Sequence, residues 1–304
     1  MTQRDSFWGE IVRVGYDDGD IMILTADSGA PAFDNFRKDR PNQFIHCGIS
    51  EASMITAAAG LSLSGKKVYC YAIVPFITGR VFDQIKVAIA LRGLPVCLVS
   101  VGTGFSYDDG GPTHFGVEDI GIMKNLKGIE IWSPSDAMCA KHVARFCLRN
   151  PAFRYVRLDR HVFQARWDFI EDFDDIADFE GSFNWVNTDL HNPSGLLISY
   201  GALRETAMKL AKEKNLIMQE LVKVHPLPAQ FLNGWTWDQV ISLEEHFLSG
   251  GIGESISSFL HDHGYKTPFI RYGLPDRYEW ENGSREYLWQ RAGIDEKTLR
   301  ACLT

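Results

Sequence analysis

No run of apolar residues in the 304-residue chain approaches the roughly 18 needed to cross a bilayer, and the opening residues MTQRDSFW lack the apolar segment of a signal peptide. We therefore expect neither a membrane span nor export, and the cytoplasm as the compartment. The six cysteines are scattered and form no CxxC pair. They are expected to be small buried side chains in a reducing compartment rather than disulfides or zinc ligands.

Positive charge is also in short supply, because 31 Lys and Arg face 39 Asp and Glu, for a formal net charge of −8. Such a surface repels phosphate backbones and argues against a nucleic-acid partner. The sequence contains no P-loop, no HExxH and no GxSxG motif. Its one Gly-rich strand-to-helix turn is GGIGES (250–255), which we interpret as a site of close helix–strand packing rather than a phosphate cradle.

What the chain does contain is an alternation of β-rich runs with helix-length segments, which predicts parallel βαβ units and an open α/β sheet. The expected strands span 21–24, 67–74, 95–101, 129–133 and 154–158, and then 195–201, 216–224, 239–245 and 268–273. The expected helices span 51–65 behind an N-cap at Ser50, 76–92, 117–126, a segment opened by Ser133-Pro134 and ending near Arg149, 202–214, and a segment after GGIG (250–253).

An acidic stretch separates the two series of elements. Residues 168–180 carry seven acidic side chains and no basic one. A charge run of this kind is typical of a solvated segment, so it predicts a boundary between two α/β domains.

Two loops that follow predicted strands are the candidate ligand sites, because open α/β sheets bind ligands at the carboxyl ends of their strands. The first, HCGISEASM (46–54), puts Glu51 in the first turn of an apolar helix. A carboxylate there complements the helix dipole, and poor solvation among apolar neighbours would also suit it to proton transfer. The second, TGFSYDDGGPTHFGVED (103–119), holds His114 beside a Gly-Gly-Pro turn. This histidine is either an ordinary loop side chain or a hydrogen-bond donor to a ligand.

Both loops belong to a longer series of motifs: GISEASM (48–54), PFITGRVFDQI (75–85), DGGPTH (109–114), SPSD (133–136), HPLP (225–228), LEEH (243–246) and GLPDRYEWENGSREYL (273–288). In this order they resemble the C-terminal two-thirds of transketolases and of 1-deoxyxylulose-5-phosphate synthases. The resemblance is closest to the separate C-terminal subunits of split-gene transketolases, and it covers essentially the whole chain. It implies a pyrimidine-binding domain with a mostly parallel open sheet (1–165), an acidic linker (166–184) and a smaller C-terminal α/β transketolase-type domain (185–304).

The resemblance also implies a cofactor that this chain does not hold by itself. Enzymes of this family use thiamine diphosphate, and they bind its diphosphate and a divalent metal through a GDG motif followed by an asparagine. The sequence has no GDG motif. We therefore expect thiamine diphosphate with Mg²⁺ or Ca²⁺ to be held mainly by a separate N-terminal transketolase subunit, with no metal ligand in this chain. Two chains of each type would form a heterotetramer.

Five residues match family positions at the cofactor ring. By resemblance Glu51 bonds a ring nitrogen of the aminopyrimidine and exchanges a proton with it, so it is the first catalytic residue. Phe76 matches the aromatic side chain that stacks on that ring. Ile73 stands where many relatives have a second phenylalanine, Arg80 falls near the ring, and Asp27 matches an acidic residue close to the cofactor.

Three further residues match substrate positions. His114 matches the loop histidine that bonds the reacting end of the substrate, and it is the second catalytic candidate. Arg160 and Arg4 match positions that hold the phosphate of a sugar, where a guanidinium suits bidentate contact. A plain surface arginine is the alternative reading of Arg160.

Three departures argue against an ordinary pentose-phosphate transketolase. Gly110 replaces an aspartate that recognises substrate hydroxyls, Gly102 replaces a histidine at the phosphate end, and Pro31 falls where a phosphate-binding serine is expected. We expect a rebuilt substrate pocket that tolerates deoxy, keto or otherwise modified sugars, since no buried carboxylate would be left unpaired by a missing hydroxyl.

The sequence thus predicts the C-terminal subunit of a two-chain, thiamine diphosphate-dependent transferase of carbohydrate metabolism, which moves a two-carbon ketol unit between sugar-type or modified sugar substrates and acts only with its partner. Three alternatives stay open. A β subunit of a 2-oxo acid dehydrogenase-type enzyme would share the element Phe82-Asp83-Gln84. A deoxyxylulose-phosphate-synthase-like enzyme would use pyruvate, and a non-catalytic partner subunit would only assemble.

Overall fold

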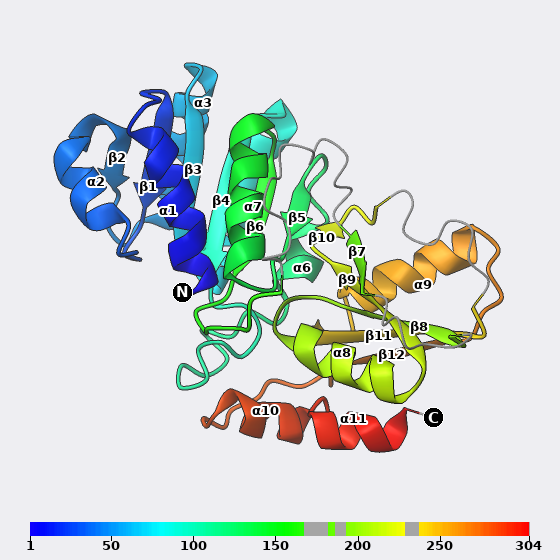
Figure 1. Cartoon of the computed structure of the whole chain (residues 1–304). Helices are drawn as coiled ribbons and strands as arrows, with labels where there is room; N and C mark the ends of the chain where they lie inside the picture. The colour runs from blue at the N-terminus through cyan, green and yellow to red at the C-terminus, as the bar shows by residue number, and fades with distance from the viewer. Residues whose placement is uncertain (167–181, 186–192, 229–236, 304) are drawn as a thin grey trace.

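Two β-sheets, each enclosed by helices, make up the protein (Figure 1). The computed structural model describes residues 1–166, 182–185, 193–228 and 237–303. The acidic stretch 168–180 lies outside these residues. Mostly parallel strands alternate with helices in both halves of the chain, so the predicted α/β class is confirmed.

The N-terminal sheet has the strand order β10-β5-β6-β4-β3-β1-β2. Its strands are β1 (Ile21–Thr25), β2 (Phe44–His46), β3 (Lys67–Ile73), β4 (Val96–Val101), β5 (Glu130–Trp132), β6 (Arg154–Leu158) and β10 (Lys223–His225). Every neighbouring pair is parallel except β10 with β5. All residues of β1, β4 and β6 are buried, as expected of central strands covered on both faces.

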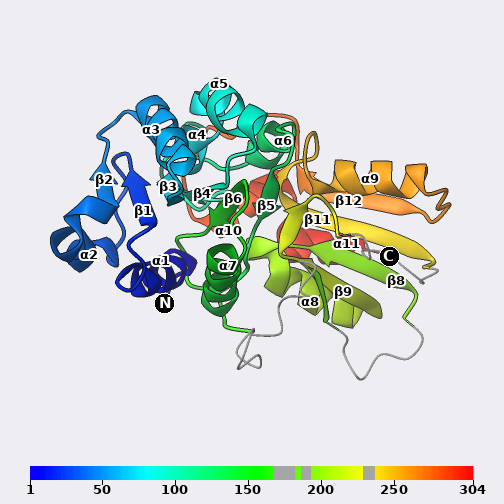
Figure 2. The same ribbon diagram turned by 90° about the horizontal axis from the view of Figure 1, so that it is seen from above.

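Helices cover both faces of this sheet (Figure 2). The first helix and the helix before β6 pack together on one face, and the others lie mainly on the opposite face. They are α1 (Gln3–Gly15), α2 (Phe33–Asp39), η1 (Pro41–Gln43), α3 (Glu51–Leu63), α4 (Val74–Ile77), η2 (Gly79–Val81), α5 (Phe82–Gln84), η3 (Ile85–Ile89), η4 (Ala90–Arg92), α6 (Asp119–Met123) and α7 (Ala137–Arg149). The sequence patterns do not predict α1, which the Thr2 hydroxyl caps by accepting a hydrogen bond from the Asp5 N–H.

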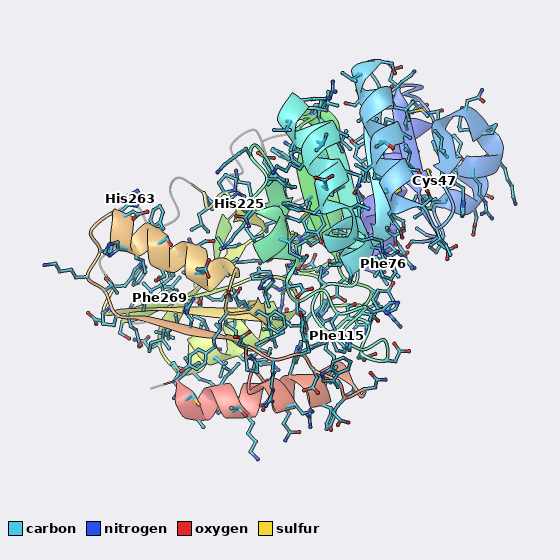
Figure 3. All side chains as sticks on the ribbon, turned by 180° about the vertical axis from the view of Figure 1, so that it is seen from behind. Cys47, Phe76, Phe115, His225, His263 and Phe269 are labelled. Atoms are coloured by element: carbon cyan, nitrogen blue, oxygen red, sulfur yellow. The ribbon has the colours of Figure 1, made fainter. Side chains whose placement is uncertain are left out.

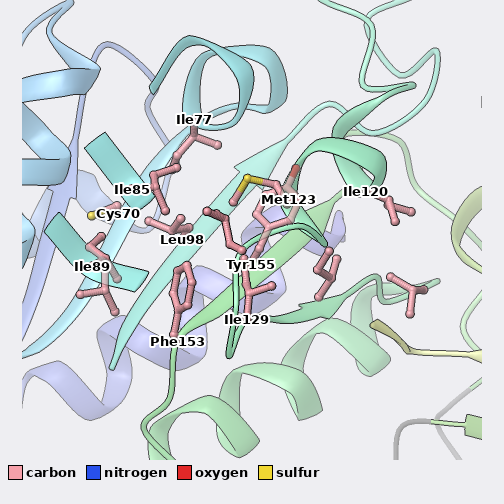
Figure 4. Close-up of a cluster of buried hydrophobic side chains, with 14 of the residues drawn as sticks. Cys70, Ile77, Ile85, Ile89, Leu98, Ile120, Met123, Ile129, Phe153 and Tyr155 are labelled. Atoms are coloured by element: carbon pink, nitrogen blue, oxygen red, sulfur yellow. The ribbon is translucent and has the colours of Figure 1, made fainter. Parts of the chain in front are cut away.

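Figure 4 shows part of the core between the sheet and this second helical layer. Leu98 of β4 and Tyr155 of β6 lie among Ile85, Ile89 and Met123, and all five are fully buried. This packing fixes the segment 82–92 against the sheet, although its local geometry is irregular.

The C-terminal sheet has the order β12-β11-β8-β9-β7, with β7 as its one antiparallel strand. The strands are β7 (Ser182–Trp185), β8 (Gly195–Ser199), β9 (Leu216–Leu221), β11 (Gln239–Phe247) and β12 (Phe269–Leu274), and the helices are η6 (Gly201–Leu203), α8 (Arg204–Glu213), α9 (Ile252–Asp262), α10 (Arg285–Ala292) and α11 (Glu296–Cys302). α9 covers one face of the sheet, and α8, α10 and α11 lie on the other.

Two predicted elements are divided in the structure. The expected strand 216–224 becomes β9 of the C-terminal sheet and β10, which crosses to pair with β5 of the N-terminal sheet. The expected helix 76–92 becomes a chain of short helical turns from α4 to η4, because Thr78 leaves the helical region at φ −116° and ψ −93°. The predicted helix 117–126 shortens to α6.

Of the two predicted helix caps, one is wrong and one is right in position only. Asp136 rather than Ser133 caps α7, and its carboxylate accepts a hydrogen bond from the Cys139 N–H at 2.8 Å. Ser50 does stand at the N-cap position of α3, but its side chain makes no capping hydrogen bond.

The predicted packing role of the GGIG turn is confirmed. A β-carbon on Gly250 would lie 2.8 Å from the backbone of Gly121, so only glycine permits this approach. The buried Glu244 carboxylate accepts hydrogen bonds from the N–H groups of Ile252 and Gly253, at 2.8 and 3.0 Å. The start of α9 is therefore satisfied by a side chain of the protein itself.

All six cysteines are free thiols. Burial is confirmed for Cys70, Cys97, Cys139 and Cys147, but the prediction is wrong for the exposed Cys302 and only partly right for Cys47. Across the described residues no helix has the length and apolarity to span a membrane. No group of three or more His, Cys, Asp or Glu side chains in the same residues could hold a metal ion.

Candidate functional site

A cavity of about 340 Å³ opens at the carboxyl edge of the N-terminal sheet. Segments that follow β1, β3 and β4 line it, together with the first turns of α1 and α3. The lining residues are Arg4, Asp27, Ser28, Gly29, Ile49, Glu51, Tyr71, Ile73, Phe76, Arg80, Val101 and Tyr107. This edge is where the topology of an open α/β sheet places a ligand.

Six of the nine residues singled out in the sequence line this one cavity, namely Arg4, Asp27, Glu51, Ile73, Phe76 and Arg80. The other three, Gly110, His114 and Arg160, stand one contact away from its lining. Residues far apart in the sequence are thus brought together, although the role of each stays a prediction.

Glu51 is the first residue of α3, and its side chain is only 6% exposed. The Nη1 group of Arg80 donates a hydrogen bond to its Oε1 at 3.0 Å. The helix N-terminus and this guanidinium both favour a negative charge at that point.

Phe76 lies in α4, directly after β3, and is half-buried against the core of the N-terminal sheet. Figure 3 shows it at the end of this sheet that faces the loop carrying Phe115. The guanidinium carbon of Arg80 lies 3.9 Å from the centroid of the Phe76 ring. The His114 ring meets Phe76 edge to face, with 5.3 Å between centroids.

The loop after β4 carries His114 and Tyr107, whose rings are 6.1 Å apart. His114 Nδ1 lies 3.0 Å from the hydroxyl oxygen of Thr113. Gly110 supports this histidine, since a β-carbon there would fall 2.8 Å from the His114 Cβ. The absence of a side chain at position 110 therefore has a packing cause.

Tyr107 connects the two predicted phosphate-binding arginines. Its ring lies 4.7 Å from the guanidinium carbon of Arg160, which also approaches Asp109 at 4.0 Å. Burial raises the pKa of Tyr107, while the charges of Arg160 and Arg4 act in the opposite direction. Arg4 itself donates a hydrogen bond to Asp5 at 2.8 Å. Arg160 therefore lies against the Tyr107 ring, and Arg4 lines the same cavity as Tyr107.

Sequence reasoning missed Tyr107 and Tyr71 as lining residues. Tyr107 belongs to the loop 103–119, which the sequence predicts as a ligand site. Its place in that loop is the feature from which it could have been predicted. At Gly102, with φ +100°, the Tyr107 ring fills the space that a side chain would need. A side chain at position 102 and the Tyr107 ring would therefore compete for the same space.

A buried ion-pair network fixes the base of this loop. Arg285 of α10 donates to Asp159 at 2.7 Å and to Glu245 at 3.0 Å, and all three side chains are buried. Asp159 also accepts hydrogen bonds from the hydroxyls of Thr103 and Ser106. The C-terminal half of the chain thereby holds the start of the loop that carries Tyr107 and His114.

The geometry suits a flat heterocycle with a polar edge. Phe76 offers an aromatic face, Glu51 a buried carboxylate, and Ile49, Ile73 and Val101 apolar walls. These residues fit the aminopyrimidine ring of thiamine diphosphate. Within the described part of the chain they include no cluster of carboxylates suited to its metal.

Comparisons with known proteins identify the family of the chain and several similar proteins. Residues 1–164 match the family described as "Transketolase, pyrimidine binding domain". The chain is 26% identical to the B subunit of the apulose-4-phosphate transketolase of Phocaeicola vulgatus, over 97% of this chain and 94% of that relative. It is 29% identical to the 1-deoxy-D-xylulose-5-phosphate synthase of Chlorobium luteolum, over 96% of this chain and 46% of that relative. A solved structure described as a split gene transketolase, inactive beta4 tetramer, superposes with a TM-score of 0.80 at 21% identity, covering 100% of this chain and 97% of its own.

Proposed function

Because this chain belongs to the transketolase pyrimidine-binding domain family, we propose that it is the C-terminal subunit of a two-chain, thiamine diphosphate-dependent transketolase-like enzyme. The enzyme transfers a two-carbon ketol unit between sugar-type or modified sugar substrates. A relative that matches nearly end to end is itself named as one subunit of a transketolase, which supports a division of the enzyme into two chains. Residues 1–165, 166–184 and 185–304 would be its pyrimidine-binding domain, linker and C-terminal domain, and the cytoplasm its compartment.

The observation that carries the proposal is the meeting of Glu51 and Phe76 at one cavity, with the His114 ring packed against Phe76. When bound, thiamine diphosphate supplies a carbanion equivalent that accepts the two-carbon unit. Phe76 would support the aminopyrimidine ring by stacking. Glu51 would hold a proton against the ring nitrogen from a site that excludes most water, and His114 would donate a hydrogen bond to the substrate near the reacting carbon.

Arg4 and Arg160 suit an anionic end of the substrate. Arg4 and Tyr107 line the cavity, and Arg160 lies over the Tyr107 ring. A phosphate or another anionic group would gain charge-assisted hydrogen bonds there. Asp27 would stand close to the cofactor ring, and Gly110 would present no carboxylate that a modified sugar could leave unpaired.

The diphosphate and its Mg²⁺ or Ca²⁺ would be held mainly by the partner chain, since the sequence has no GDG motif. The outer face of α3 supports assembly, because its exposed side chains are all small or apolar and uncharged: Ala52, Ser53, Thr56, Ala57, Gly60 and Leu63. The neighbouring Val87 and Leu91 are 52% and 72% exposed. Such a surface favours close approach of another chain in a heterotetramer.

The test compares this chain alone with the chain assembled with a subunit that carries the GDG motif. Calorimetry with thiamine diphosphate and Mg²⁺ should give weak binding to the lone chain and tight binding to the assembly. Glu51→Gln should slow thiazolium proton exchange in the assembly by about 100- to 10,000-fold without changing its folding or assembly. Tight binding by the lone monomer, or a normal exchange rate in Glu51→Gln, would contradict the proposal.

A deoxyxylulose-phosphate-synthase-like activity is the second candidate, favoured by the 29% identity to a synthase of that class. The two candidates differ in their donor substrate. Consumption of a ketose donor supports the transketolase-like function, whereas consumption of pyruvate with release of carbon dioxide supports the synthase-like one.

A further inference from the structure

Arg80 lies between the two side chains that the proposed function assigns to the aminopyrimidine ring. Its guanidinium carbon is 3.9 Å from the centroid of the Phe76 ring. Its Nη1 group donates to Oε1 of Glu51 at 3.0 Å. The planar guanidinium group of Arg80 therefore stacks on the Phe76 ring and pairs with the Glu51 carboxylate at the same time.

An aminopyrimidine would need the same two partners. It is flat, it stacks on an aromatic face, and it hydrogen-bonds a carboxylate at its edge. A guanidinium meets each of these demands, because it is planar, cationic and rich in N–H donors. The edge of the His114 ring contacts Phe76 as well, with 5.3 Å between centroids, which limits the room for a second stacked group.

We infer that, in the absence of cofactor, Arg80 occupies the aminopyrimidine site and must swing out before the cofactor ring can enter. This inference rests on the proposed function, and it reverses the sequence-based expectation that Arg80 binds the cofactor. In this arrangement the Arg80 guanidinium takes both the Phe76 face and the Oε1 atom of Glu51, which the cofactor ring would need.

The contacts of Arg80 are consistent with a side chain that can leave. Its side chain is 45% exposed, whereas that of Glu51 is 6% exposed. Thr78 and Gly79 precede it at a break in the helical turns, so the segment is not held by a regular helix. The arginine can move into solvent while Glu51 and Phe76 stay in place.

When a side chain of the protein fills the site, only a fraction of the molecules can bind the cofactor. The apparent Kd is then the intrinsic Kd divided by that fraction. Arg80→Ala should therefore bind thiamine diphosphate about 5- to 20-fold more tightly than the unmodified chain, as expected from the loss of one ion pair and one cation–π contact. Arg80→Lys, which keeps the charge but not the plane, should fall between the two. Arg92→Ala, at an exposed arginine in η4, is the matched control and should leave affinity unchanged.

The experiment measures thiamine diphosphate binding in the presence of Mg²⁺ by calorimetry on the assembled two-chain enzyme. Weaker or unchanged binding by Arg80→Ala would overturn the inference, and weaker binding would make Arg80 a ligand of the cofactor. A thermal double-mutant cycle of Arg80→Ala with Glu51→Gln, without cofactor, should show non-additive melting shifts, and strict additivity would also overturn it.

Phe76→Ala separates this inference from the proposed function. If the unmodified assembly binds the cofactor and Phe76→Ala weakens binding, the proposed function stands whatever Arg80→Ala does. If no assembly binds thiamine diphosphate, or if Phe76→Ala binds it normally, the proposed function fails and the inference fails with it.

Discussion

The backbone of Gly110 lies directly against the side chain of His114, and a β-carbon added at position 110 would fall 2.8 Å from the His114 Cβ. In the sequence, Gly110 is notable as the place of a missing aspartate. In the structure, Gly110 also packs against His114, the second predicted catalytic residue.

The first prediction separates these two roles of Gly110. Gly110→Ala should lower turnover of the assembled enzyme by about 100-fold, because a shift of about 1 Å in a positioned group costs that much. Gly110→Asp should be impaired at least as strongly. Gly9→Ala is the control, since a β-carbon on Gly9 meets nothing within 4 Å.

Steady-state rates on a paired panel of a sugar phosphate and its deoxy analogue decide the matter. If Gly110→Ala keeps full activity while Gly110→Asp shifts preference toward the hydroxylated substrate, the missing carboxylate rather than packing explains Gly110.

The second prediction concerns the cation beside Tyr107. Arg160→Gln should raise KM for a phosphorylated ketose about 10- to 100-fold, the range expected for a lost charged hydrogen bond, and should change kcat little. Arg37→Gln removes another arginine from the surface, where its pair with Asp34 is exposed on both sides, and should have no effect. An equal rise in KM for a neutral sugar would show that Arg160 does not recognise an anionic group.

The third prediction compares two arginines that each pair with two carboxylates. Arg285 lies buried between Asp159 and Glu245, whereas Arg300 lies exposed between Glu213 and Glu296. Arg285→Ala should cost about 3–5 kcal/mol of unfolding free energy, because two buried carboxylates lose their partner. Arg300→Ala should cost at most about 1 kcal/mol.

Urea unfolding followed by fluorescence gives both values. A small loss in Arg285→Ala would mean that the network contributes little to stability, and that Asp159 and Glu245 are satisfied without the arginine.

The fourth prediction concerns acid stability. Burial lowers the pKa of His246 from 6.5 to about 4, so this side chain stays neutral in the fold at pH values where the unfolded chain is protonated. Stability is therefore lost as pH falls from about 6.5 to about 4, by up to about 3 kcal/mol for this one group. Burial also lowers the pKa of His142, to about 4, so this side chain adds to the same acid sensitivity.

His246→Asn should flatten the acid limb of the stability curve, because asparagine keeps a donor for the Phe247 carbonyl but does not titrate. Chemical unfolding between pH 4 and pH 7 measures the slope. An unchanged slope in the variant would show that His246 does not contribute to acid sensitivity.

The two loops that carry Glu51 and His114 follow from the residues, and the other site residues were predicted from the resemblance to the transketolase family. Glu51 and Phe76 stand in the first turns of helices and His114 in a loop, all near the carboxyl ends of parallel strands, which share one edge of a sheet. Hydrophobic patterning depends on residues close together in the sequence, so most of the predicted strands are strands in the structure. Where the pattern was weak, as in α1, α10 and α11, the helices were missed.

The side-chain contacts within the site, unlike the strands, could not be predicted from the sequence. The placement of Arg80 between Phe76 and Glu51 depends on a break at Thr78 that regular helical spacing does not predict. The fit of Tyr107 against Gly102 depends on a loop conformation that propensity does not fix. A helix or a strand is selected by neighbours a few residues away, and the sequence by itself determines it. A side chain's partner is selected by the space and charge left after the chain has folded, so only the tertiary structure decided that Arg80 stands where a cofactor ring would lie.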